Sequence, residues 1–215
     1  MCPIKLIIFD LDDTLIRSHI NYHQIRQEIA ELFDSPIPEN TITKTPILKL
    51  LEKLKEVHPN KYSEGYRRVY ETEREATKRA DIIEGAQAIP RLLKKYKIHS
   101  AIYTNNSLNT VRQYLAKPKF DFLHEFQILT REDFKNPKPD PEGLLKIIEI
   151  HQSTEINRKN TAYVGDSYID AIAAHRAKVK FIWFNSREVN PDLFPTQPYA
   201  ILSNWADFES IILQK

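Results

Sequence analysis

Three carboxylates lie close together near the N-terminus of the sequence, directly after a short apolar run. Asp10, Asp12 and Asp13 follow residues 4–9, which read IKLIIF. Like charges repel one another, so such a cluster is costly unless a cation lies among the side chains. Oxygen ligands of this kind suit Mg²⁺. The alternative is an acidic turn in which Asp12 or Asp13 caps a helix, and the cluster alone leaves that alternative open.

A second acidic pair occurs in the segment GDSYID at residues 165–170. If a helix starts here, Asp166 and Asp170 are four residues apart and share one face, where two like charges destabilise the helix. Attraction to the positive end of the helix explains Asp166 reasonably and Asp170 poorly. The pair therefore predicts a positive charge between or beside the two carboxylates.

The segment TNNS at residues 104–107 comes directly before a predicted helix. Thr104 supplies a hydroxyl group, and the free backbone amides at a helix N-terminus bind anions. This combination predicts an anion site. The alternative for Ser107 is a plain N-cap, and the segment alone does not decide between the two.

Lys138 lies in the segment PKPDP at residues 137–141. The neighbouring prolines stiffen its backbone, and Asp140 is placed to cap a helix that has Pro141 at its first position. A lysine held rigidly by its neighbours suggests a fixed charge partner. The alternative is no more than a rigid turn.

Each of these segments follows a short apolar run, which is typical of a strand buried on both faces of a parallel sheet. Helical patterns separate the runs, for example Ile169, Ile172 and Ala173 on one helical face. The alternation predicts right-handed βαβ units and an α/β fold with a doubly wound parallel sheet. Because ligands bind at the carboxyl ends of such strands, the cation site, the anion site and the lysine should surround one crevice. The predicted strands are residues 4–9, 98–103, 126–129, 161–164, 180–184 and 199–202.

Residues 17–82 break this alternation and contain no convincing strand. Apolar residues recur there with the period of a helix in three stripes, which begin at Tyr22, Ile47 and Tyr62. Prolines separate the stripes. We therefore predict a small helical domain at 17–82, inserted into an α/β core domain formed by 1–16 and 83–215.

The composition excludes several classes of function. A formal net charge of +2 implies no strong attraction to nucleic acid or membranes, and residues 6–9 are too short to span a bilayer. The 4 glycines form neither a GxGxxG nor a Walker loop. Cys2 is the single cysteine, so no intramolecular disulfide is possible and a reducing, cytoplasmic location is expected.

Taken together, the motifs resemble those of the haloacid dehalogenase-like hydrolase superfamily over nearly the whole length. The helical insertion is similar to the cap that phosphoglycolate phosphatase-like members carry after their first motif. The segments that carry the resemblance are the nucleophile motif FDLDDTL at 9–15, the phosphate-binding motif YTN at 103–105, Lys138-Pro139, and GDSYID at 165–170.

The resemblance implies a two-step displacement at phosphorus. Asp10 would attack and form an aspartyl phosphate. Asp12 would protonate the leaving oxygen and then deprotonate the attacking water. Dehalogenase relatives lack an acid at this position, so its presence favours phosphoryl transfer. A phosphomutase of the same superfamily and a non-catalytic binding protein on this fold are the alternatives.

The resemblance also implies a cofactor and a substrate class. The substrate would be a small phosphorylated metabolite whose identity the sequence does not give, and the chain would be a monomer or a homodimer. Mg²⁺ would be held by Asp10, the backbone carbonyl of Asp12 and Asp166, with Asp170 acting through water or a hydrogen bond, and the phosphate by Thr104, Asn105 and Lys138. Candidates for substrate selection are Arg17, His19, Lys44, Arg67, Tyr70 and Arg74.

Two positions depart from the family pattern, because Asp13 and Lys178 stand where relatives often have glycine. Lys178 lies at the predicted C-terminus of a helix, where glycine adopts a left-handed backbone. A lysine in that conformation costs about 1 kcal/mol. Neither departure argues against activity.

Overall fold

The computed structural model describes residues 3–152, 155–185 and 194–213, so Cys2 and the side chain of Lys44 lie outside the description. The chain divides into two compact units. Met1–Arg17 and Asp81–Lys215 form the larger unit, and Ser18–Ala80 form the smaller one. Over the described ranges, we find no helix with the length and apolar character that crossing a membrane requires.

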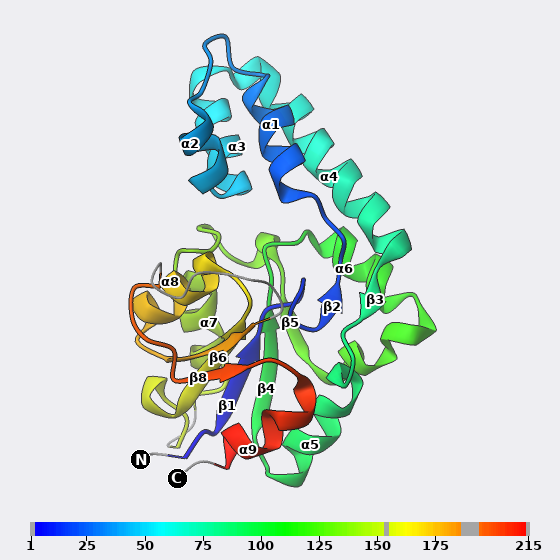
Figure 1. Cartoon of the computed structure of the whole chain (residues 1–215), viewed down its shortest axis with the longest axis vertical. Coiled ribbons are helices and arrows are strands. Elements are labelled where there is room, and N and C mark those ends of the chain that lie inside the picture. The colour runs from blue at the N-terminus through cyan, green and yellow to red at the C-terminus, as the bar shows by residue number, and fades with distance from the viewer. Residues whose placement is uncertain (1–2, 153–154, 186–193, 214–215) are drawn as a thin grey trace. The chain divides into compact units, whose positions relative to one another are not determined.

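The larger unit is built on a six-stranded sheet in the order β5-β4-β1-β6-β7-β8 (Figure 1). Every neighbouring pair of strands runs parallel. The chain moves outward from β1 in one direction and then returns to the other side of β1, which makes the carboxyl end of β1 a topological switch point. The doubly wound α/β fold predicted from the apolar runs is confirmed. The strands are β1 (Leu6–Phe9), β4 (His99–Tyr103), β5 (Gln127–Leu129), β6 (Thr161–Gly165), β7 (Lys180–Phe184) and β8 (Ala200–Leu202).

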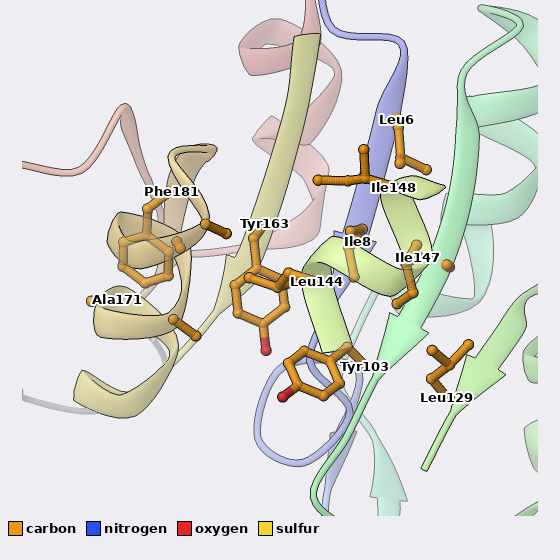
Figure 2. Packing of buried hydrophobic residues seen from close by; sticks show 14 of the residues in the cluster. Leu6, Ile8, Tyr103, Leu129, Leu144, Ile147, Ile148, Tyr163, Ala171 and Phe181 are labelled. Carbon is orange, nitrogen blue, oxygen red and sulfur yellow. The ribbon is translucent and has the colours of Figure 1, made fainter. Parts of the chain in front are cut away.

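Helices cover both faces of this sheet. Side chains alternate along a strand, so Leu6 and Ile8 pack on one face with α7 and α8, while Phe9 points to the other face and meets the ring of Phe208 in α9 at 5.9 Å. The cluster on the first face includes Leu6, Ile8, Tyr103, Leu144, Ile147, Tyr163 and Ala171 (Figure 2). The helices of this unit are α5 (Ile89–Lys95), α6 (Leu108–Leu115), α7 (Glu142–Ile150), α8 (Tyr168–Ala177) and α9 (Phe208–Ile212).

The inward face of α8 differs from the predicted one. The sequence pattern favoured a stripe of Ile169, Ile172 and Ala173, but both isoleucines are only partly buried, and the fully buried residues include Ala174 and Asp170. Alanines on the inward face let the helix approach the sheet closely, because they add little volume between the two backbones. This rotation turns a carboxylate into the protein interior.

A two-stranded antiparallel ladder was also missed. It joins β2 (Ile16–Arg17) to β3 (Asp81–Ile82) at the two ends of the inserted segment. The expectation that 17–82 contains no strand is therefore wrong at both ends of that range. Strands of two residues are too short to leave a period-two pattern in the sequence.

The smaller unit is a helical bundle. Three of its helices correspond to the predicted stripes, and the fourth, α2, was not expected, because the prolines before and after it looked like breaks. Pro38 and Pro46 instead stand at the N-caps of α2 and α3. A Cβ on Gly65 of α4 would lie 2.9 Å from side-chain atoms of Leu51 and Leu54, so α3 and α4 meet closely at this glycine. The helices are α1 (Tyr22–Ala30), α2 (Glu39–Lys44), α3 (Ile47–Val57) and α4 (Tyr62–Arg79).

The C-terminus of α8 gives a test of backbone strain. Lys178 has φ 58° and ψ 43°, so the left-handed conformation predicted from the family pattern is confirmed. Replacing Lys178 with glycine should stabilise the protein by roughly 1 kcal/mol, because glycine has no Cβ to strain this backbone. In a chain of this size the melting temperature should rise by about 2–4 °C. Lys178→Ala keeps the Cβ and serves as the matched control. A glycine variant that melts no higher than this control would contradict the assignment.

Candidate active site

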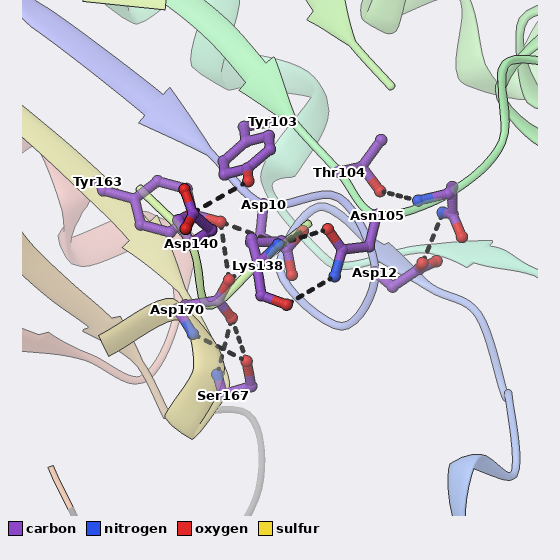
Figure 3. A network of polar contacts seen from close by, with 11 residues as sticks. Asp10, Asp12, Tyr103, Thr104, Asn105, Lys138, Asp140, Tyr163, Ser167 and Asp170 are labelled. Atoms are coloured by element: carbon purple, nitrogen blue, oxygen red, sulfur yellow. Dashed lines mark hydrogen bonds and ion pairs between the residues drawn. The ribbon is translucent and has the colours of Figure 1, made fainter. Parts of the chain in front are cut away.

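The side chains that the sequence predicted for catalysis, phosphate binding and metal binding lie at the carboxyl edge of the parallel sheet (Figure 3). Asp10 follows β1 directly, and its backbone N–H donates to the carbonyl of Val164 in β6 at 2.8 Å. Thr104 follows β4 and donates to the carbonyl of Leu129 in β5 at 3.0 Å. Asp166 follows β6. Hydrogen bonds between neighbouring strands therefore continue one residue beyond the ends of β1 and β4 and fix the backbones of Asp10 and Thr104.

Lys138 lies at the centre of the site. Its Nζ donates to Oδ1 of Asp10 at 2.6 Å, to Oδ1 of Asp170 at 2.9 Å and to the hydroxyl of Tyr163 at 3.0 Å. Only 2% of the lysine side chain is exposed, so its buried charge requires the anionic partners that these hydrogen bonds supply. The fixed charge partner predicted for Lys138 is therefore a pair of carboxylates, Asp10 and Asp170.

Aromatic rings complete the surroundings of this ammonium group. Nζ of Lys138 lies 5.3 Å from the ring centroid of Tyr103 and 5.7 Å from that of Tyr163, within the range of cation–π attraction. Burial lowers the pKa of Lys138, but attraction to Asp10 and Asp170 outweighs burial, and the pKa lies above its ordinary value. Lys138 is thus held in its charged form.

The carboxylates of the site carry more negative charge than Lys138 balances. Burial raises the pKa of Asp10 to about 7, and repulsion from Asp170 adds to the rise, while Lys138 opposes it. Burial, followed by repulsion from Asp170 and Asp10, raises the pKa of Asp166 well above its ordinary value. Three buried carboxylates around one lysine are unfavourable as they stand, which is the situation that a bound cation relieves.

The donor set suits a hard divalent cation. Asp10, Asp166 and Asp170 each offer a carboxylate oxygen, and these oxygens lie within 4.8 Å of one another. Oxygen ligands with surplus negative charge match the preference of Mg²⁺. Both oxygens of Asp170 accept hydrogen bonds from the protein, so Asp10 and Asp166 are the better candidates for direct ligands.

Asp170 has two structural tasks at once. Its Oδ1 accepts from Lys138 and, at 2.7 Å, from the hydroxyl of Tyr163. Its Oδ2 accepts from the backbone N–H of Ser167 at 3.1 Å and from the Ser167 hydroxyl. Ser167 and Asp170 form a capping box at the start of α8. The sequence argument that a helix N-terminus explains Asp170 poorly is therefore wrong, since this residue caps the helix and holds the lysine.

Close packing at Gly165 permits this arrangement. A Cβ at residue 165 would lie 2.6 Å from Cβ and Cγ of Asp170. Any side chain at this position would push the Asp170 carboxylate away from Lys138. The glycine at the end of β6 is thus required by the approach of α8.

Hydrogen bonds hold the segments that carry the predicted phosphate-binding residues. Oγ1 of Thr104 accepts from the backbone N–H of Asn106 at 3.1 Å. The Asn105 side chain clasps the backbone of Lys138, because its Oδ1 accepts from the Lys138 N–H at 3.0 Å and its Nδ2 donates to the Lys138 carbonyl at 3.4 Å. The second and third motifs are therefore tied together through Asn105.

The N-terminus of α6 is less open to anions than the sequence suggested. Ser107 is its N-cap, and its hydroxyl oxygen accepts from the N–H of Thr110 at 3.1 Å. The N–H of Leu108 donates to the Glu132 carboxylate at 2.8 Å. The plain N-cap role is thus correct for Ser107, and the helix already has an anion from its own chain. This leaves Thr104 and Asn105 as the candidates for contact with a phosphate group.

Asp12 lies in a tight turn beyond Asp10 and is buried. Its Oδ2 accepts a hydrogen bond of 2.6 Å from Nδ2 of Asn106. The next residue, Asp13, has φ 54°, which accounts for the glycine that relatives often carry there. Its N–H donates to the carbonyl of Ile16 at 2.6 Å and closes the turn.

Two residues of the site were not predicted from the sequence. Tyr163 bonds Lys138 and Asp170, and Asn106 bonds Asp12. A signal existed for Tyr163, because a phenol in a strand buried on both faces must find a polar partner. No pattern in the sequence distinguished the side chain of Asn106 from that of Asn105.

Two candidates for substrate selection in the smaller unit, Arg67 and Arg74, have ion pairs with residues of their own helix. Arg67 is paired on its own helix with Glu64 at 2.7 Å and with Glu71 at 2.7 Å. Arg74 lies 3.6 Å from Glu75. These local ion pairs on an exposed helix surface favour a solvated role for both arginines.

Comparisons with known proteins identify the family of this chain. The family model described as haloacid dehalogenase-like hydrolase matches residues 7–184. A pyrophosphatase PpaX from Bacillus mycoides (strain KBAB4) is 26% identical over 83% of this chain and 82% of its own length. A phosphoglycolate phosphatase from Cereibacter sphaeroides is 27% identical over 96% of each chain. The crystal structure of a hydrolase from Pseudomonas syringae shares the fold, with a TM-score of 0.76, 20% identity and 97% of each chain covered. The chain therefore belongs to the haloacid dehalogenase-like hydrolase family.

Proposed function

We propose that this chain is a magnesium-dependent phosphohydrolase that cleaves a small phosphorylated metabolite through an aspartyl phosphate on Asp10. The observation that carries the proposal is the buried Asp10, which bonds Lys138 at 2.6 Å, with Asp12 two residues further along the chain. Family membership supports hydrolysis, and relatives named pyrophosphatase and phosphoglycolate phosphatase support phosphate chemistry.

The first chemical step forms a bond between an Asp10 carboxylate oxygen and phosphorus while the bond from phosphorus to the leaving oxygen breaks. Asp12 gives its proton to that leaving oxygen. Lys138 offsets the charge of the attacking carboxylate and of the phosphoryl oxygens, and Thr104 and Asn105 orient the remaining oxygens. In the second step, Asp12 takes a proton from water, the water oxygen forms a bond to phosphorus, and the bond from phosphorus to the Asp10 oxygen breaks. The products are inorganic phosphate and the free carboxylate of Asp10.

We assign the magnesium site to Asp10, Asp166 and the backbone carbonyl of Asp12, with Asp170 supporting the site through its hydrogen bonds. A divalent cation bound there supplies the charge neutralisation that lets an anionic carboxylate approach a phosphate dianion. Burial and mutual repulsion raise the pKa of Asp10 and of Asp166, and this cost of holding the charged carboxylates together supports the assignment.

Hydrolysis of an aryl phosphate should require Mg²⁺ and should stop when EDTA is added in excess. Ca²⁺ should restore little activity, because its longer and looser coordination misplaces the nucleophile. The measurement is the rate of phenol release in metal-depleted buffer, before and after each cation is added back. Undiminished hydrolysis in the metal-depleted buffer would exclude the magnesium assignment.

The two named activities of the relatives suggest two substrate classes. Phosphoglycolate is a monoester, whereas pyrophosphate has an anhydride bond and a leaving group that is itself a phosphate. Release of phosphate from a panel of phosphorylated metabolites that includes pyrophosphate tests the proposal and separates the two classes. No release from any member in the presence of Mg²⁺ would count against hydrolysis. Transfer of phosphate between positions of a sugar, without net release, would favour the phosphomutase alternative.

We further propose that the inserted helical segment, 17–82 by sequence and Ser18–Ala80 as a compact unit, is a cap that selects the substrate. The residues that we propose to bind the phosphate group and the magnesium ion all lie in the larger unit. They would contact only the phosphate group of the substrate. Specificity for the rest of the substrate would then come from elsewhere in the chain, and the insertion, which is similar to the cap of phosphoglycolate phosphatase-like relatives, is the candidate for that role.

A further inference from the structure

Asn106 is anchored on three sides. Its backbone N–H donates to Oγ1 of Thr104 at 3.1 Å, and its carbonyl accepts from the N–H of Arg131 at 3.0 Å. Its side-chain Nδ2 donates to Oδ2 of Asp12 at 2.6 Å, a contact drawn at Asp12 in Figure 3. Only 5% of Asn106 is exposed. The residue therefore connects the phosphate-binding segment to the loop that carries Asp12.

The chemistry assigned to Asp12 demands a fixed orientation. A general acid must lie within hydrogen-bond reach of the oxygen that it protonates, and rotation of a carboxyl group about its last bond is broad and weakly restrained. An amide NH₂ group can only donate a hydrogen bond. While this bond is made, Oδ2 of Asp12 accepts, and the transferable proton is favoured on Oδ1, because the carbonyl oxygen of a carboxylic acid is a better acceptor than its hydroxyl oxygen.

We propose that Asn106 is a positioning residue that holds Asp12 in the orientation needed to protonate the leaving group. The inference rests on the proposed function, because it assumes that Asp12 is the general acid. It adds a direct connection between the segment of Thr104, which is assigned to phosphate binding, and the group that gives the proton. The backbone bonds of Asn106 do not depend on its side chain, so shortening the side chain removes the bond to Asp12 and retains the loop.

The test compares kcat/KM for phosphate esters whose leaving groups range from nitrophenol to simple alcohols. Asn106→Ala should lose roughly 10- to 100-fold on alkyl phosphates, because Asp12 becomes a carboxylate as it gives up its proton and a hydrogen bond to a charged group is worth about that factor. The loss on p-nitrophenyl phosphate should be much smaller, since that leaving group needs no proton. Asn106→Asp keeps the shape of the side chain but replaces the donor with an acceptor. Its kcat/KM should show the same dependence on the leaving group, with a larger loss on alkyl phosphates. Asn109→Ala, at an exposed position of α6, is the matched control and should show no dependence on the leaving group.

Two further results separate the inference from the proposed function. If Asn106→Ala and Asn106→Asp lose the same factor on every ester, or lose nothing, Asn106 does not position the acid. If Asp12→Ala itself lacks the dependence on the leaving group, the role of Asp12 fails and the inference fails with it. The double variant Asp12→Ala/Asn106→Ala should be no slower than Asp12→Ala, because the asparagine acts only through the carboxylate. An additive loss would contradict the inference even where Asp12 behaves as expected.

Discussion

Replacing Asp10 with asparagine is expected to abolish turnover, with a loss in kcat on the order of 10⁶, as in other enzymes that lose their nucleophile. The amide has the shape of the carboxylate but is a poor nucleophile toward phosphorus. The substitution should leave the protein folded, because Lys138 retains Asp170 as a partner at 2.9 Å. Phosphate release by concentrated enzyme measures the residual rate, and the melting curve verifies the fold.

A matched control for this substitution is Asp13→Asn. It removes a carboxylate from the same loop, and asparagine tolerates the left-handed backbone at this position. The control should retain most of the activity, because Asp13 has no assigned role in the reaction. An Asp10→Asn protein that turns over like this control, with deamidation and contamination excluded, would contradict the assignment of the nucleophile.

Asp12→Ala should slow hydrolysis by roughly 10²–10⁴, the usual contribution of a general acid–base group. The loss should be largest for alkyl phosphates, whose leaving oxygen needs a proton. With an acidic phenol as leaving group, the first step should proceed while the second is slow, because water lacks its base. A burst of phenol followed by a slow steady rate is the expected observation. A uniform loss for all leaving groups, without a burst, would contradict the role of Asp12.

The sequence was sufficient to predict the parallel sheet and the edge of the sheet at which the candidate site residues meet. The six strands left apolar runs, and Asp10, Thr104 and Asp166 came directly after three of them, so the meeting of these residues at one edge followed from parallel topology alone. Elements without such a signal were missed. The ladder of Ile16–Arg17 with Asp81–Ile82 is too short for a pattern, and α2 begins after a proline that the sequence presented as a break.

The hydrogen bonds between side chains could not be predicted from the sequence, for a different reason than the missed short elements. The bond from Asn106 to Asp12 joins residues 94 positions apart in the chain, and nothing in either segment indicates which asparagine turns toward the loop. The inward rotation of α8 likewise depends on how closely its alanines let it approach the sheet, which a count of apolar residues does not reveal. Asp170 could be assigned to the site by resemblance, but its bonds to Tyr163 and Ser167 required the three-dimensional structure.

The formation of an aspartyl phosphate on Asp10 is the central claim, and trapping that adduct tests it most directly. The Asp12→Ala protein is mixed with Mg²⁺ and an aryl phosphate, quenched in acid within the burst, digested and analysed by mass spectrometry. The account predicts one added phosphoryl group on the peptide that contains residues 6–17, located at Asp10. A phosphoryl group on Asp13 or Ser167, or turnover with phenol released in a burst but no phosphorylated peptide, would contradict it.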